Sequence, residues 1–218
     1  LLSVALLVAA KRLLIGRYAA VRTPVWGGLY LRHWIVTRAA RGVPWALIAS
    51  TALQAAVLRA LGARVGRGVH VERGVDLTRG GWDLLSIDDG AALGRDAVLD
   101  VVALHAGHLV CGPIRIGAGA TVEARAVVGP FASLGAGAVL APLSWLPPGS
   151  HVPEGRRWDG VPARPAGDAD APPAGRGRGR ALSERAFAAA SVLARLGLAL
   201  VAAAPLVLAG LFVARRSG

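Results

Sequence analysis

Large aliphatic residues recur at every sixth position through the middle of the chain. From residue 116 to residue 152 the series is unbroken: Ile116, Val122, Val128, Leu134, Leu140, Leu146 and Val152. A small residue follows each of the first six by four positions: Ala120, Ala126, Ala132, Ala138, Ser144 and Ser150. A helix repeats at 3.6 residues and a strand at 2, so neither sustains a period of six. The pattern predicts a three-sided coil of stacked rungs, with the aliphatic side chains inside and the small ones at the corners.

The same spacing extends towards the N-terminus with two interruptions. The earlier anchors are Val65, Val71 and Leu77, followed by Ile87, Leu93, Leu99, His105 and Cys111. Ten residues separate Leu77 from Ile87, and five separate Cys111 from Ile116. We therefore expect a β-helix over about residues 63–167, with His105 and Cys111 at inward positions. A disordered segment rich in Gly and Ala would not keep this phase.

Apolar segments flank the predicted coil. Residues 1–10 end at a pair of cations and are too short to cross a bilayer, so we expect the end of a spanning helix that begins upstream. Residues 186–214 form the second candidate, with 18 uncharged residues before another cation pair. A buried helix of a soluble protein is the alternative. Residues 11–62 mix aromatics with arginines and predict interfacial and capping helices. Residues 168–185 are rich in Ala, Pro, Gly and Arg, which is typical of a linker.

Composition narrows the possible partners. The formal net charge is +12, and the basic residues are arginines apart from Lys11. No basic helix with interleaved aromatics occurs, so nucleic acid is disfavoured as a partner. Cys111 is the single cysteine, which excludes a disulfide framework, and no Cys/His spacing predicts a metal site. The absence of Met and the apolar start lead us to expect a piece of a longer chain.

The six-residue phase and the exit GVPARP at residues 160–165 resemble the hexapeptide-repeat acyltransferases. That resemblance implies a mainly β fold, a left-handed parallel β-helix. Three further stretches, at residues 16–36, 61–71 and 112–122, are similar to the membrane-linked tandem C-terminal domains of nonribosomal peptide synthetases of the epsilon-poly-L-lysine-synthetase type. In that family the repeats sit between transmembrane helices and are thought to form amide bonds from an aminoacyl thioester.

The narrower resemblance also implies partners and a location. The donor would be a thioester, carried either by a carrier protein's phosphopantetheine or by coenzyme A, and the acceptor would be an amine. Membrane lipid and other copies of the same domain are the remaining implied partners. The resemblance places the chain in a bacterial membrane with several spans, and the excess of Arg favours the cytoplasmic side for the coil.

Histidine suits the base that acyl transfer requires, because its reference pKa is about 6.5. His108 and His105 are the candidates within the coil; His108 falls off the anchor phase and should reach the surface. The family pattern has acidic residues near residues 102–107, and this chain lacks them. Three functions stay open: an amide-forming aminoacyl transferase, a coenzyme A-dependent acyltransferase, and a non-catalytic scaffold.

The remaining candidates bind substrate rather than react. Asp88 and Asp89 are adjacent carboxylates that can orient an amine, although solvated turn residues are the plainer interpretation. Arg164 in the exit segment can contact a carrier phosphate or simply cap the coil. Cys111 is expected to be a small buried side chain rather than a nucleophile. His33 lies among the interfacial aromatics, and the sequence assigns it no chemistry.

Overall fold

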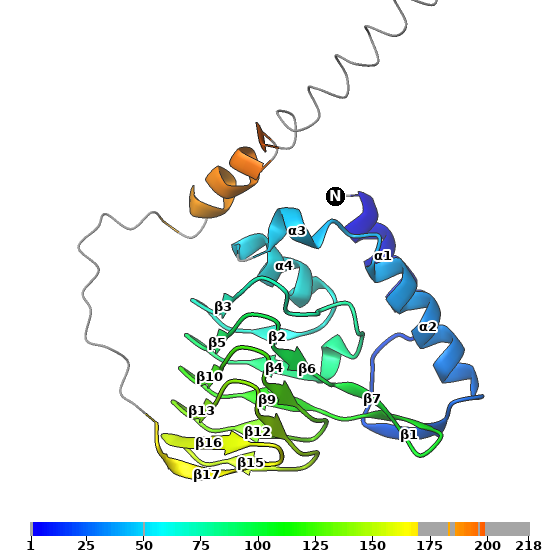
Figure 1. Cartoon of the computed structure of the whole chain (residues 1–218). Helices are drawn as coiled ribbons and strands as arrows, with labels where there is room; N and C mark the ends of the chain where they lie inside the picture. Colours follow the sequence, from blue (N-terminus) through cyan, green and yellow to red (C-terminus); the bar gives the residue numbers. More distant parts are fainter. Residues whose placement is uncertain (1, 50, 170–182, 184–185, 196, 199–218) are drawn as a thin grey trace, which may run out of the picture.

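The computed structural model describes residues 2–49, 51–169, 183, 186–195 and 197–198. A β-helix forms most of this part of the chain, with helices gathered at its N-terminal end (Figure 1). A hairpin projects from one side of the β-helix, next to the second helix of the chain. The architecture is therefore a coil with one covered end and one lateral excursion.

Three parallel sheets form the sides of the coil. The first contains β2 (Arg64–Val65), β4 (Leu85–Ile87), β9 (Ile114–Ile116), β12 (Ser133–Leu134) and β15 (His151–Val152). The second contains β3 (His70–Val71), β5 (Ala92–Leu93), β10 (Thr121–Val122), β13 (Val139–Leu140), β16 (Arg156–Gly160) and the antiparallel β17 (Ala163–Asp168). The third contains β6 (Val98–Leu99), β11 (Val127–Val128) and β14 (Trp145–Leu146).

The six-residue rule is confirmed from β9 to β15. Val122 pairs with Leu140, 18 positions later, so one full turn takes three six-residue sides. The last residue of each of these strands is an anchor and is buried, as are the corner alanines. Gly117 and Gly135, each directly after an anchor, show how closely the rungs stack: a Cβ on either would lie 2.6–2.7 Å from a backbone nitrogen of the next rung. Close stacking of rungs therefore excludes larger residues there.

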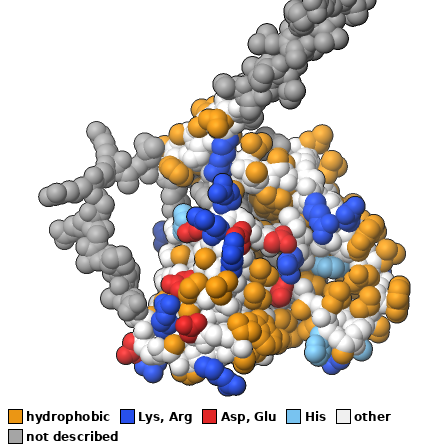
Figure 2. Space-filling view, in the orientation of Figure 1, with side chains coloured by type: hydrophobic (Ala, Val, Ile, Leu, Met, Phe, Trp, Pro, Cys, Tyr) orange, Lys and Arg blue, Asp and Glu red, His pale blue; other side chains and the backbone are white. Residues whose placement is uncertain are grey.

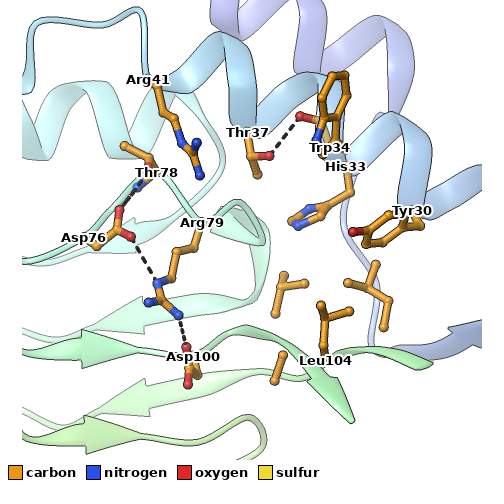
Figure 3. Close-up of a pocket in the computed structure, with 13 residues that line it drawn as sticks. Tyr30, His33, Trp34, Thr37, Arg41, Asp76, Thr78, Arg79, Asp100 and Leu104 are labelled. Atoms are coloured by element: carbon orange, nitrogen blue, oxygen red, sulfur yellow. Dashed lines mark hydrogen bonds and ion pairs between the residues drawn. The ribbon is translucent and has the colours of Figure 1, made fainter. Parts of the chain in front are cut away.

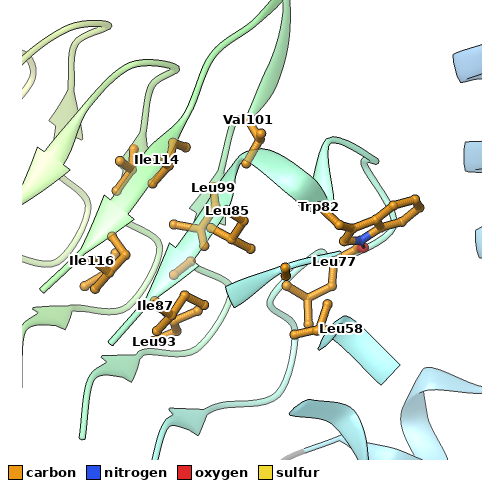
Figure 4. Close-up of a cluster of buried hydrophobic side chains, with 14 of the residues drawn as sticks. Leu58, Leu77, Trp82, Leu85, Ile87, Leu93, Leu99, Val101, Ile114 and Ile116 are labelled. Atoms are coloured by element: carbon orange, nitrogen blue, oxygen red, sulfur yellow. Dashed lines mark hydrogen bonds between the residues drawn. The ribbon is translucent and has the colours of Figure 1, made fainter. Parts of the chain in front are cut away.

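Helices cover the first rung of the coil. α1 (Leu2–Leu14) packs on α2 (Gly28–Ala40), and the short α3 (Trp45–Ile48) precedes α4 (Ala52–Ala60). The capping part of the helical segment predicted over residues 11–62 is thus divided into α3 and α4, because Ala49 has an extended backbone. α4 buries Leu58 among the first coil anchors (Figure 4). The Arg59 guanidinium donates to the carbonyls of Val65 and Gly66, which fixes this cap to the coil.

The step before Ile116 is an excursion rather than a rung. β7 (Val102–His105) and β8 (His108–Cys111) form an antiparallel hairpin, and β1 (Val21–Pro24) pairs with β8 to complete a three-stranded sheet. The expectation that His105 points inward is therefore wrong: its side chain is exposed. Its six-residue spacing is a coincidence of hairpin length. Cys111, at the base of the hairpin, is fully buried as expected.

The interruption between Leu77 and Ile87 folds as a short 3₁₀ turn, η1 (Trp82–Leu84). Trp82 is almost fully buried, and its indole N–H donates to the Leu77 carbonyl at 2.9 Å. Gly80 and Gly81 both have positive φ, and a side chain on Gly80 would collide with His33 and Tyr18 at 2.9 Å. This loop therefore brings the coil close to the N-terminal segment.

None of the described helices is both long and apolar enough to cross a bilayer. Most of the second predicted span, 186–214, and of the linker, 168–185, lies outside the described residues. Residues 186–195 are helical, and Arg195 donates to the carbonyls of Ala46, Leu47 and Ala49. That contact joins the described part of this segment to α3.

Candidate active site

The tip of the projecting hairpin carries the two predicted catalytic histidines. His105 and His108 are directly opposite each other in the β7–β8 ladder, on either side of an Ala106–Gly107 turn with positive φ. Cross-strand partners share a face, so both imidazoles lie on the side of the sheet opposite to Leu104 and Leu109. The structure thus brings these two candidates together.

His108 is oriented by its own turn. Its Nδ1 lies 2.8 Å from the carbonyl oxygen of Ala106. A carbonyl only accepts, so Nδ1 carries the hydrogen and Nε2 of the neutral ring keeps its lone pair. The side chain is half-buried and Nε2 has no partner within the described residues. This arrangement is what a general base requires.

The predicted substrate-binding residues lie elsewhere. Asp88 and Asp89 follow β4 at a corner of the coil, where Asp89 accepts a hydrogen bond from the Arg67 amide at 2.7 Å. Arg164 lies in β17 at the opposite end of the coil, across from Asp159 in the antiparallel β16–β17 ladder. Neither the carboxylates nor Arg164 belongs to the hairpin. Asp89 stabilises its local turn through the bond to Arg67.

A cavity of about 470 Å³ lies on the other face of the hairpin. α2 contributes His33 and Thr37, and Arg41 follows directly after its last residue; the four-residue spacing places all three on one side (Figure 3). The loop after β3 contributes Asp76 and Arg79, and the hairpin contributes apolar side chains including Leu104 and Leu109. The site therefore combines an apolar wall with a polar one.

Arg79 is held by two carboxylates at the edge of this cavity. Its Nε lies 3.1 Å from Asp76 and its terminal nitrogen 2.5 Å from Asp100 (Figure 3). Burial acts to raise the pKa of Asp76, but hydrogen bonds from Thr78 and the Arg79 charge outweigh it, so the pKa is lowered. The Asp76 carboxylate therefore stays charged, and its bond to Arg79 helps to fix the guanidinium in place.

His33 is the residue of this cavity that sequence reasoning missed. Its Nδ1 lies 3.0 Å from the Tyr18 hydroxyl, and its ring points into the cavity (Figure 3). Burial lowers the pKa of His33 to about 4 and raises the pKa of Tyr18 well above its usual value. Both side chains are therefore neutral near pH 7. The four-residue spacing of His33, Thr37 and Arg41 was the available signal, but it was hidden among interfacial aromatics.

Tyr18 is positioned by a buried ion pair. Lys11 of α1 and Asp83 of the 3₁₀ turn approach to 2.7 Å, with side chains only 5% and 13% exposed. Asp83 also accepts a hydrogen bond from the Tyr18 amide at 2.9 Å. The pair thus connects α1, the segment after it and the interrupted rung of the coil.

Comparison with known proteins gives a fold and a partial sequence relationship. No family model matches the chain. A maltose O-acetyltransferase from Clostridium difficile superposes with a TM-score of 0.52 at 12% identity, covering 74% of this chain and 97% of that one. A hexapeptide-repeat acetyltransferase from Vibrio cholerae, solved with acetyl coenzyme A, gives a TM-score of 0.46 at 16% identity, covering 63% and 89%.

The fold is accordingly that of the hexapeptide-repeat acyltransferases, which confirms the resemblance seen in the sequence. More particularly, 168 residues are 33% identical to a delta-poly-L-ornithine synthetase from Acinetobacter baumannii. This match covers 77% of the chain but only 12% of that synthetase. The chain is thus similar to one short part of a much longer protein.

Proposed function

We propose that the chain is an acyltransferase domain that forms an amide from a thioester and an amine, with His108 as general base. The observation that carries the proposal is the hydrogen bond from His108 Nδ1 to the Ala106 carbonyl, which leaves Nε2 as an acceptor at an accessible hairpin tip. The acyltransferase fold and the similarity to a poly-ornithine synthetase both favour this chemistry.

In the proposed step the amine nitrogen attacks the thioester carbonyl. A C–N bond forms and the C–S bond breaks, while His108 Nε2 accepts the amine proton and returns it to the departing thiolate. No oxidant or metal enters this balance. His105 lies across the ladder and is placed to contact the same reactants.

Two donors fit the same chemistry. The similarity to a poly-ornithine synthetase favours an aminoacyl donor, whereas the V. cholerae acetyltransferase was solved with acetyl coenzyme A. We propose the aminoacyl thioester as the physiological donor, because the sequence similarity is to the synthetase. Other copies of the domain are proposed to supply the opposite wall of the exposed histidine face.

The test compares amide formation by the 218-residue chain with ornithyl and acetyl thioesters, each with an amine acceptor. His108→Ala should lower kcat about 10²- to 10⁴-fold, the range that a general base contributes. His70→Ala, at an exposed coil position, is the matched control and should keep the wild-type rate. Equal rates for wild type and His108→Ala would overturn the mechanism. An inactive wild-type chain would favour the scaffold alternative.

Membrane association is proposed separately. α1 and α2 expose several large apolar side chains: Leu2, Leu6, Leu13, Leu31, Trp34 and Ile35. Figure 2 shows hydrophobic side chains with interspersed cations on the α2 side of the molecule. Such mixtures suit an anionic bilayer surface. Co-sedimentation with anionic vesicles should decrease for Leu6→Ser/Leu13→Ser, and unchanged binding would contradict the proposal.

A further inference from the structure

The hydrogen-bond pattern around Tyr18 fixes which nitrogen of His33 carries its hydrogen. The Gly81 backbone N–H faces the Tyr18 oxygen and acts to lower the pKa of this hydroxyl. The hydroxyl hydrogen is therefore directed away from Gly81, and the acceptor that lies within hydrogen-bond distance is His33 Nδ1, at 3.0 Å. Nδ1 then acts as the acceptor, so the neutral ring must carry its hydrogen on Nε2. The tautomer of His33 is thus opposite to that of His108, which carries its hydrogen on Nδ1 and leaves Nε2 as an acceptor.

The cavity around His33 has one cation that is not neutralised. Arg79 lies between Asp76 and Asp100, so these three side chains together carry one negative charge. Arg41 lines the same cavity and has no carboxylate partner among the described residues. The lining is therefore close to neutral as a whole, which disfavours a dianion. It offers two separate attractions for a single negative charge: the Arg41 guanidinium and the directed His33 donor.

The rest of the cavity is apolar on its hairpin side. Val102, Leu104 and Leu109 form that wall, and the side chain of Leu104 is 62% exposed. A short aliphatic group of the ligand would cover it, which is favourable by roughly 0.8 kcal/mol per buried CH₂. The volume of about 470 Å³ is within the usual range of small-molecule sites.

We propose that this cavity binds a small monocarboxylate with an aliphatic body. His33 Nε2–H and Arg41 are its oxygen ligands, and Tyr18 is the residue that positions His33. The site lies on the face of the hairpin opposite His108, and it does not depend on the transfer activity proposed above. His33 acts here as a hydrogen-bond donor and not as a base.

Side-chain ¹⁵N NMR of the histidines in the 218-residue chain tests the first half of the proposal. At pH 7 we expect His33 to show a protonated Nε2 and an unprotonated Nδ1, with its signals assigned by their loss in His33→Gln. Tyr18→Phe should release this preference and give a mixture of tautomers. A hydrogen on Nδ1 of wild-type His33 would overturn the proposal.

Titration with butyrate tests the second half. Butyrate should shift the His33 Nε2 signal, whereas butyramide, of the same shape without the charge, and inorganic phosphate should bind at least tenfold more weakly. Arg41→Gln should weaken butyrate about tenfold or more, the range for a charge-assisted hydrogen bond. Arg38→Gln is the matched control, since Arg38 stacks over Trp34 at 5.8 Å and does not line the cavity. Equal affinities for butyrate and butyramide, or an unchanged Arg41→Gln, would refute the site.

Discussion

The regular coil from β9 to β15 and the interrupted half of the molecule before it are held together differently. In the regular coil the inward positions are aliphatic and the rungs stack through parallel ladders. Among the described residues the fully buried polar side chains are Lys11, Thr51, Gln54 and Ser144, and three of these four precede the regular coil. In the regular coil the buried polar side chain is Ser144, a corner residue that donates to Asp159. The interrupted half instead depends on specific polar pairs such as Lys11 with Asp83.

The same difference explains where a cavity can form. Anchors from three sides fill the interior of the coil, so a ligand cannot enter there. At the two interruptions the chain instead extends from the coil towards α2. The cavity is lined by α2, the loop of the first interruption and the hairpin of the second. The regular rungs therefore form a closed, packed body. The cavity lies where the six-residue spacing is interrupted. Four variants test this division.

The largest effect is expected at the ion pair of the interrupted half. Asp83→Ala should lower the free energy of unfolding by about 4 kcal/mol, because it leaves Lys11 buried without a counter-charge. The double variant Lys11→Met/Asp83→Asn should recover most of this loss, since Asn can still accept from the Tyr18 amide. Urea denaturation of both variants measures the difference. A loss as large in the double variant as in the single one would mean that packing, not charge, dominates.

A coil anchor should come next. Leu140→Ala removes a fully buried side chain and should cost about 3 kcal/mol by loss of transfer energy and creation of a cavity. The control is the same substitution in the hairpin, Leu104→Ala, where the side chain is 62% exposed. It should lower the free energy of unfolding by less than about 0.5 kcal/mol. Similar losses in the two variants, by urea denaturation, would contradict the proposed division.

The third prediction concerns acid. Burial lowers the pKa of His33 from 6.5 to about 4, so the unfolded chain takes up this proton first as the pH falls. Stability from this group is complete above pH 6.5 and should decline by about 3 kcal/mol as the pH falls to 4. His33→Gln should flatten that part of the profile of unfolding free energy against pH. The exposed substitution His151→Gln should not, and an unchanged slope in His33→Gln would refute the assignment.

The smallest effect tests a corner of the coil. Leu143 has φ of 60° and its side chain is 65% exposed, so its backbone is strained without a compensating burial of the side chain. Leu143→Asn should raise the free energy of unfolding by up to about 1 kcal/mol, because Asn tolerates this backbone conformation. Leu104→Asn, on a strand, should give no such gain. A lower melting temperature for Leu143→Asn would show that Leu143 has a packing role.

The sequence predicted the coil well because each anchor makes the same contact in every rung. Ile116 and Leu134 pair across rungs as their spacing requires. The prediction for His105 was wrong because a hairpin of suitable length imitates one more side of the coil. The spacing of His33 with Thr37 and Arg41 could have placed these residues on one helix face, but not the hydrogen bond to Tyr18 or the contact with Gly80 of a distant loop. A periodic sequence predicts contacts that recur in every rung. It does not predict a contact that occurs at one place between distant segments.

The 18-residue turn from Val122 to Leu140 has a consequence for engineering. Duplicating one whole turn within β9–β15 should lengthen the body by one strand spacing, about 4.8 Å, and leave every side chain facing as before. The β7–β8 hairpin would then lie farther from the antiparallel β16–β17 pair by one such increment for each turn added. The molecule can therefore serve as a molecular ruler between its two ends.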